Sequence, residues 1–312
     1  MTHNSSAIAQ GDRVLSSPGS GGLGWGLVGV AAFSLTVPLT RITVQDGAMS
    51  AMFAGIGRAV VAALLAAVAL AVTRQRRPRG TQWWRLAVVA GGVVIGFPVL
   101  TAYALTTTSA AHSAVVIALL PAATAVAAVV RGRERPPRSF WITAGVAAAA
   151  AVGFAALRSG GLGGLHGAGL LLLGAVVAAA IGYAEGGLLA RELGSWQTIS
   201  WALVLSAPVT TAVTVVAVAE HPPTGAATEW AAFAYLAVVS MFLGFFAWYR
   251  GLAIGPMTRV SQIQLTQPVM TICWAALLLG EQPTTSVLVG GAAVILCAAT
   301  AVRSRSAPVR PL

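Results

Sequence analysis

The segment SQIQLTQPVMTICW, from Ser261 to Trp274, carries three amides and three hydroxyls among apolar neighbours. On a helix that turns about 100° per residue, one face collects four of these side chains, namely Ser261, Gln264, Gln267 and Thr271. Amides and hydroxyls aligned in this way can bind a small solute, or they can hydrogen-bond to neighbouring helices. We favour solute binding, because a row of four exceeds what helix packing usually requires.

Two charged residues, Arg58 and Glu185, lie within long apolar segments. Arg58 lies about ten residues into its segment, where a buried arginine costs at least about 3 kcal/mol unless it finds partners. It could attract an anionic group, or it could bond backbone carbonyls freed near Pro38 or Pro268, and we favour the structural role. Glu185 could carry a coupling proton, or it could pair with an arginine at the membrane interface.

Tyr103 and Trp248 each place a large aromatic face at the end of an apolar segment. Either ring could line a substrate pocket or pack in the core. Pro121 and Pro268 each remove a backbone donor in mid-helix, which predicts a kink and a carbonyl that needs another partner. Histidines and cysteines are too scattered for metal ligation, and no nucleophile–base motif occurs. We therefore expect no cofactor, no metal and no catalytic residues.

The 312-residue chain is 57% hydrophobic, only 9% charged, and has a mean hydropathy of +0.82. An ordinary soluble domain is about 25% charged, so this composition predicts an integral membrane protein. Apolar runs of about 20 residues, the length that a helix needs to cross the hydrocarbon core, recur along the chain. They predict an all-α membrane protein with ten transmembrane helices, at residues 23–40, 48–72, 84–105, 110–130, 140–157, 168–190, 198–219, 230–249, 258–279 and 285–302.

All 19 positively charged residues are arginines, and the formal net charge is +11. With a cytoplasmic N-terminus, nearly all of them fall in cytoplasmic loops and tails; the exceptions are Arg41 and Arg158 outside and Arg58 within a span. The positive-inside rule explains this distribution, so the charge does not call for a nucleic-acid partner. We expect a multi-pass protein of the cell (inner) membrane with both termini in the cytoplasm.

An internal repeat divides the chain into two halves. A proline, a glutamate and a second proline recur with the same spacing and a constant offset of 147 residues: Pro121, Glu134 and Pro136 in the first copy, Pro268, Glu281 and Pro283 in the second. Five spans per half would make the second half enter the membrane from the opposite side, as in many secondary transporters. We expect a disordered cytoplasmic tail at 1–22, five-helix repeats at 23–157 and 168–302, and a cytoplasmic tail at 303–312.

The repeated segments resemble the signature of a transporter family. YALTTTSAAHSAVVIALLPAATAVAAVVRGRERP and YRGLAIGPMTRVSQIQLTQPVMTICWAALLLGEQP are similar to the hallmark segments of EamA-type transporters in the drug/metabolite transporter (DMT) superfamily. Arg133 departs from this pattern, since the second copy has Gly280 before its glutamate. The resemblance implies inverted five-helix repeats around a central cavity, with a basic residue near the position of Arg58. It also implies export or import of small metabolites or drugs by alternating access. Of the two directions, we expect export.

The expected partners are a small-molecule substrate and the lipid bilayer, while proton coupling and a homodimer stay open. A cavity with amides and aromatic rings would suit amino acids, nucleosides, purines or amphipathic drugs equally well. The alternative function is that of a non-transporting polytopic membrane scaffold. A scaffold would expose small-residue or apolar faces to a partner and would not need the polar row of the ninth span.

Overall fold

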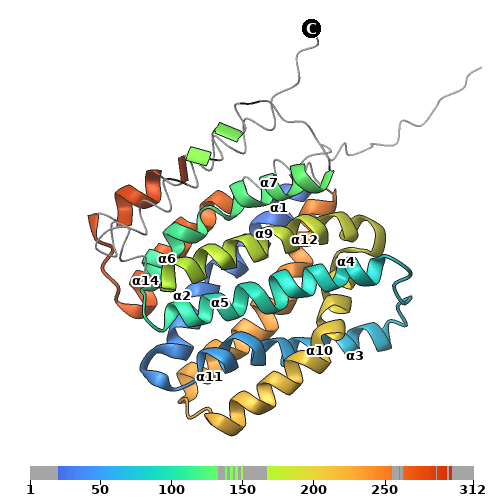
Figure 1. Ribbon diagram of the computed structural model, residues 1–312, viewed down its shortest axis with the longest axis horizontal. Coiled ribbons are helices and arrows are strands. Elements are labelled where there is room, and N and C mark those ends of the chain that lie inside the picture. Colours follow the sequence, from blue (N-terminus) through green and yellow to red (C-terminus); the bar gives the residue numbers. More distant parts are fainter. Residues whose placement is uncertain are drawn as a thin grey trace, which may run out of the picture.

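The computed structural model describes residues 20–132, 167–254, 263–285 and 287–293, with a few isolated positions besides. All of its described elements are helical (Figure 1). Those of the first half are α1 (Ser20–Ser34), α2 (Thr36–Val44), the 3₁₀ turn η1 (Gln45–Gly47), the π-helical η2 (Phe53–Gly57), α3 (Arg58–Val72), α4 (Gln82–Val89), the π-helical η3 (Ala90–Gly96), α5 (Phe97–Leu105), α6 (Ala110–Ile117) and α7 (Leu120–Gly132). Those of the second half are α9 (Gly167–Leu193), α10 (Ser195–Glu220), α11 (Ala227–Tyr235), the π-helical η5 (Leu236–Leu243), α12 (Gly244–Ile254), the 3₁₀ turn η6 (Gln264–Thr266) and α14 (Gln267–Leu279).

Seven of the described helical stretches are long and apolar enough to cross a membrane: Gly21–Gly47, Phe53–Val72, Gln82–Leu105, Ala110–Arg131, Gly167–Leu193, Ser195–Glu220 and Ala227–Ile254. They correspond to the first four and the sixth to eighth spans expected from the sequence. Part of the ninth is present as the shorter apolar stretch Gln264–Leu279. Only isolated positions of the expected fifth span are described, whereas residues 287–293 of the expected tenth span are described and helical. The C-terminal tail and most of the N-terminal tail lie outside the described residues. In a helix the backbone satisfies its own polar groups, which is what the interior of a bilayer requires.

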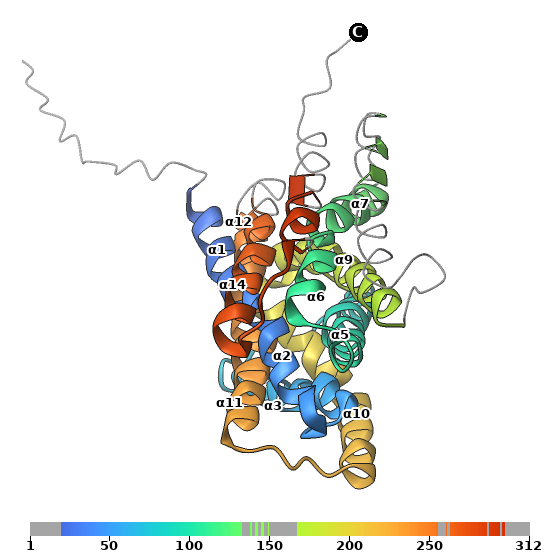
Figure 2. The ribbon, with the colours of Figure 1, turned by 90° about the vertical axis from the view of Figure 1, so that its left-hand side faces the viewer.

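Helices of the first half pack against helices of the second throughout the bundle. α1 lies along α12, α9 lies along η3 and α5, α10 packs on α3, and α14 packs on α6. Figure 1 shows α9 running between α7 and α5, and Figure 2 shows α14 beside α2 and α6. The first span (α1) packs on the eighth (α12), and the sixth span (α9) packs on the third (η3 and α5). The repeat relates the first span to the sixth and the third to the eighth, so these two pairs are equivalent. Two similar halves that interlock produce this pattern.

Glycines allow close approach at these two pairs of spans. A Cβ atom on Gly251 of α12 would lie 2.8 Å from the backbone nitrogen of Gly26 and 2.9 Å from the carbonyl oxygen of Gly22, both in α1. A Cβ atom on Gly182 of α9 would lie 3.2 Å from the backbone nitrogen of Val93 in η3. Neither crossing has room for a side chain, so the backbones pack directly on each other.

Departures from regular α-helix recur at equivalent positions in the two halves. The π-helical segments Ala90–Gly96 and Leu236–Leu243 coincide within one residue under the offset of 147. The fourth span is interrupted between α6 and α7, shortly before Pro121, and the ninth contains the turn η6, shortly before Pro268. Proline lacks the N–H that would continue the regular helical ladder, so an irregular turn before it is expected.

The connecting loops divide between two ends of the bundle. The loop that carries Arg74–Arg79 meets the start of α10, where the Gln197 amide donates to the side chain of Gln75 over 3.2 Å. Before the other end of this span, Phe53–Val72, the backbone N–H of Thr224 donates to the Ala48 carbonyl over 2.9 Å. We call the first the arginine-rich end and the second the opposite end. The α10–α11 loop, which contains Thr224, therefore lies across the bundle from the basic loop.

Candidate functional site

A small cavity lies in the centre of the bundle, between the two halves. Its volume is about 20 Å³, which leaves room for about one water molecule. The polar side chains that line it are Thr36, Arg58, Ser240 and Gln267, and the aromatic ones are Phe33, Phe97, Tyr183 and Phe245. They come from six of the spans, and both halves of the chain contribute to the wall.

The polar row of the ninth span takes up three different positions. Gln267 lines the cavity, and its side-chain oxygen has no hydrogen-bond partner among the described residues. Gln264 is 2% exposed, and neither polar atom of its amide has a partner among those residues. Thr271 donates its hydroxyl to the carbonyl of Ser34 over 2.8 Å. Ser261 lies outside the described residues. In this polar row, Gln267 therefore faces the cavity and Thr271 connects two helices.

The carbonyl that Thr271 bonds belongs to an interruption in the first span. α1 ends at Ser34, and Pro38, four residues later, has no N–H to donate to the Ser34 carbonyl. The indole of Trp274 adds a 3.1 Å hydrogen bond to the Ser34 hydroxyl. The sequence left open that Arg58 bonds such a freed carbonyl, but the structure gives this role to α14.

Arg58 is 1% exposed at the start of α3 and lines the cavity. Its Nε donates to the carbonyl of Gly55, in its own helix, over a long 3.4 Å. Among the described residues, its Nη1 has no hydrogen-bond partner and no carboxylate forms an ion pair with it. A buried guanidinium with so little bonding is costly. The structure therefore gives weak support to a purely structural role.

An aromatic cluster forms one side of the cavity. Phe33 and Phe245 lie 4.9 Å apart between ring centroids, and Tyr183 lies 6.0 Å from Phe245. Trp248 belongs to the cluster but is fully buried behind it, with its backbone against Gly29, and does not line the cavity. The other aromatic candidate, Tyr103, is 41% exposed near the end of α5 and does not line the cavity either.

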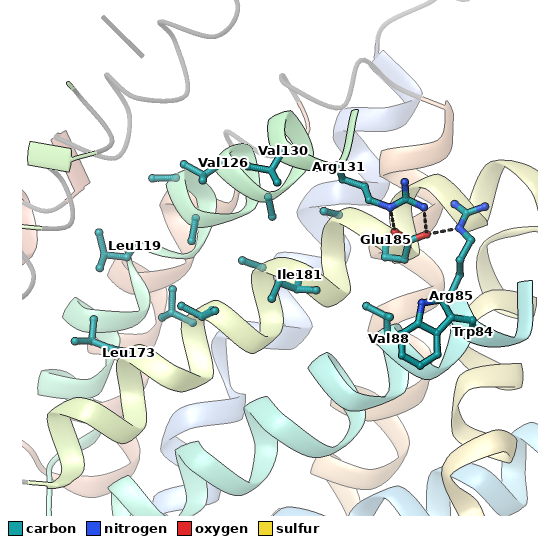
Figure 3. Close-up of a pocket in the computed structure, with 17 residues that line it drawn as sticks. Trp84, Arg85, Val88, Leu119, Val126, Val130, Arg131, Leu173, Ile181 and Glu185 are labelled. Carbon is teal, nitrogen blue, oxygen red and sulfur yellow. Dashed lines mark hydrogen bonds and ion pairs between the residues drawn. The ribbon is translucent and has the colours of Figure 1, made fainter. Parts of the chain in front are cut away.

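An ion cluster connects the halves at the arginine-rich end (Figure 3). The Glu185 carboxylate of α9 accepts from Arg85 of α4 and, over 2.6 Å, from Nε of Arg131 of α7. Arg85 also contacts Glu192 over 2.5 Å. Glu185 is buried, so two arginines of the first half compensate one carboxylate of the second. Pairing with arginines at the interface was one of the two roles that the sequence left open for this residue.

A larger groove of about 770 Å³ runs from this ion cluster along α7 and α9 (Figure 3). Apart from Trp84 and the charged residues, aliphatic side chains line it, and some, such as Val130 and Val177, are more than half exposed. It lies on a different face of α9 from the cavity, because Ala180 lines the groove while Ala179 lines the cavity. We assign the site to the cavity, which lies between the halves and holds the polar side chains.

A second contact connects the halves at the opposite end. The two carboxylate oxygens of Glu281 accept hydrogen bonds from the backbone nitrogens of Ala110 and Ala111, each over 2.9 Å. These are the first N–H groups of α6, which have no helical partner, and a carboxylate is favourable at a helix N-terminus. Gly280, left-handed at φ 63°, ends α14 and turns the chain toward α6. In the sequence, Glu281 is visible only as a marker of the repeat, because nothing in the pattern tells which helix N-terminus its carboxylate meets.

The groups around the cavity suit binding and release of a solute. They are a guanidinium, an amide, hydroxyls and aromatic rings. Within the described part of the chain, no three His, Cys, Asp or Glu residues could together hold a metal ion. Such a site can hold a small molecule through hydrogen bonds and apolar contacts.

Comparison with known proteins agrees with this description. The sequence pattern of the EamA-like transporter family matches the chain twice, at residues 20–156 and 167–303, so the two matches begin and end 147 residues apart. The uncharacterized transporter YdeK of Bacillus subtilis (strain 168) is 41% identical over 282 residues, which are 90% of this chain and 97% of that protein. A solved crystal structure aligns with 92% of this chain and 98% of its own, at a TM-score of 0.63 and 17% identity, which shows a shared fold. The resemblance found in the sequence is thereby confirmed: the chain is a multi-pass membrane transporter, not an enzyme, and belongs to the EamA-like transporter family.

Proposed function

We propose that this transporter carries a small metabolite or drug across the cell membrane by alternating access, with export as its direction. The observation that carries the proposal is a pair of contacts at the two ends of one span, Ala110–Arg131. Glu281 bonds the beginning of this span, and Glu185 pairs with Arg131 at its end. Both glutamates belong to the second half and the span belongs to the first.

The two contacts explain how the central cavity could open to one side at a time. Each closes the boundary between the halves at one end, and the cavity lies between them. With both contacts formed and space for about one water molecule, the structure has the features of an occluded conformation. Breaking the Glu281 contact would open the opposite end, and breaking the Glu185 cluster would open the arginine-rich end.

The architecture in this proposal is an inverted repeat of five helices per half, with both termini in the cytoplasm. Its support is the double match to the family, the recurrence of π-helical and interrupted turns at one offset, and the interlocked span pairs. The arginine-rich end is the cytoplasmic one, because positive charge favours that side.

Alternating access can be tested before a substrate is known. In a background with Cys273→Ser and Cys297→Ser, the variant Ala179→Cys places a thiol in the cavity wall. A membrane-impermeant thiol reagent should label it from either side, in intact cells and in inverted vesicles. Ala175→Cys, one turn away and fully buried, is the matched control and should stay unlabelled. Labelling of Ala179→Cys from one side only, or from neither, would contradict alternating access.

Transport itself is tested by the metabolites that a cell retains or loses. Cells that overproduce the protein and cells that lack it should differ in the level of at least one small metabolite, and the purified protein should carry that compound into or out of proteoliposomes. A scaffold that does not transport would leave both measurements unchanged.

A further inference from the structure

We propose that the cavity, once it opens beyond the space for about one water molecule seen in this structure, binds a small organic anion, a carboxylate with an apolar body, and that Arg58 is the residue that binds the carboxylate. This inference rests on the proposed transport function and specifies its substrate class. Its starting point is the position of Arg58, which is almost completely buried and lines the cavity.

No described residue neutralises this guanidinium. Among the described residues, the ion pairs involve Arg85 and Arg131, and Nη1 of Arg58 has no hydrogen-bond partner. Within the described part of the chain, its one hydrogen bond is the 3.4 Å contact from Nε to the Gly55 carbonyl. Burying a charge without a counter-charge is strongly unfavourable. A group from outside the chain that carries a negative charge would remove this cost.

A carboxylate fits the geometry better than a phosphate does. A guanidinium can bind a carboxylate with two parallel hydrogen bonds. Arg58 is the only cationic side chain among the described residues that line this cavity, so a doubly charged phosphate would stay half compensated. One positive charge matches one carboxylate.

The rest of the cavity wall specifies the remainder of the ligand. Phe33, Phe97 and Phe245 offer apolar ring surface for an apolar and preferably flat body. The unpaired side-chain oxygen of Gln267 can accept one hydrogen bond from the ligand. The hydroxyls of Thr36 and Ser240 already bond each other over 2.7 Å, so they are less available. A cationic ligand would instead place its charge next to Arg58.

The test measures thermal unfolding of the purified full-length protein in detergent, with matched pairs of probes. Benzoate and phenylacetate are the acids, benzamide and phenylacetamide their neutral counterparts, and benzylammonium the cation. A ligand that binds only the folded protein raises its melting temperature. We expect at least one acid to raise it, and its amide to need a concentration about tenfold higher or more for the same shift, since the charged hydrogen bonds are lost.

Variants assign the effect to Arg58. Arg58→Gln should abolish the shift caused by the acid, and Arg58→Lys should keep part of it. Arg41→Gln is the control, because Arg41 bonds the carbonyl of Leu105 and does not line the cavity. It should lower the starting melting temperature and keep the shift. If Arg58→Gln does not fold, the acid–amide comparison on the unaltered protein still decides.

The outcomes separate this inference from the transport proposal. Equal shifts with acids and amides, a shift only with the cation, or no shift with any probe at millimolar concentration would overturn the anion site. Labelling of Ala179→Cys from both sides together with one of these results would leave alternating access intact. An acid-specific shift together with labelling from neither side would keep the anion site and refute the transport mechanism.

Discussion

The carboxylate of Glu281 and the backbone N–H of Ala110 lie 171 residues apart in the chain and 2.9 Å apart in space. Glu281→Gln should lower the free energy of unfolding by about 0.5–2 kcal/mol, because the amide can accept only one of the two hydrogen bonds and carries no charge for the helix terminus. Denaturant unfolding in detergent measures this loss. The same variant should increase labelling of Ala179→Cys from outside. Glu220→Gln, an exposed change at the same end, should alter neither quantity.

The ion cluster at Glu185 should control the other end. Glu185→Gln leaves Arg85 and Arg131 without this partner and should cost about 1–3 kcal/mol, less than a fully buried pair because the Arg131 side chain is 52% exposed. Labelling of Ala179→Cys from the cytoplasmic side should increase. Glu192→Gln is the control, since Glu192 pairs with Arg85 but its side chain is 45% exposed; an equal effect there would argue against a specific role for Glu185.

The two glutamines of the ninth span should respond in opposite ways. Gln267→Leu should reduce binding of an acid probe at unchanged melting temperature, because Gln267 lines the cavity and its amide N–H can donate to a carboxylate. Gln264→Leu should raise the free energy of unfolding by about 1 kcal/mol, because a buried amide without partners is replaced by an apolar side chain. Thr266→Val, on the exposed side, should do neither. A loss of stability in Gln264→Leu would show that its amide has a partner in the folded protein.

At the crossing of α1 and α12, a methyl group should be destabilising on Gly251 and should be tolerated on Gly24. Gly251→Ala places a Cβ 2.8 Å from the backbone of Gly26, which should cost about 1–3 kcal/mol through overpacking. Gly24→Ala has no atom within 4 Å of the new methyl group and should be neutral or stabilising by up to about 1 kcal/mol. Melting temperatures of the two variants, measured side by side, check the difference.

Thiol labelling can measure directly on which side of the membrane each loop lies. A thiol at the exposed position Thr224→Cys should react with an impermeant reagent on intact cells, and one at Arg77→Cys should react only after the membrane is opened. The structure places these loops at opposite ends of the bundle, so they cannot share a side. The reverse pattern of labelling would require the orientation proposed here to be inverted.

Much of the architecture follows from patterns that depend on composition and spacing. The apolar segments set the positions of the described spans, since a bilayer requires helices of this length. The repeat was visible because Pro121 and Pro268 are each followed by a glutamate and a second proline at the same spacing, and the two family matches have the same offset of 147 residues. Burial of Gln264, Gln267 and Thr271 on one side, with Thr266 exposed, follows the turn of a helix.

The partners of these side chains could not be read from the sequence. Periodicity tells which face of a helix is polar, but it does not tell which neighbouring helix that face meets. Thr271 bonds Ser34 because the first span is interrupted there, and Trp248 is buried behind the cavity because its helix lies against Gly29. Both facts depend on the packing of segments more than 200 residues apart.

The guanidinium of Arg58, with which no described carboxylate pairs, has a kinetic consequence. If occlusion encloses it without a counter-charge, the empty carrier must cross a higher barrier to change sides than the carrier loaded with an anion. Loaded protein would then return faster than empty protein. An anion on one side of the membrane would then speed the movement of an anion from the other side. One-for-one exchange of anions would therefore be faster than net transport.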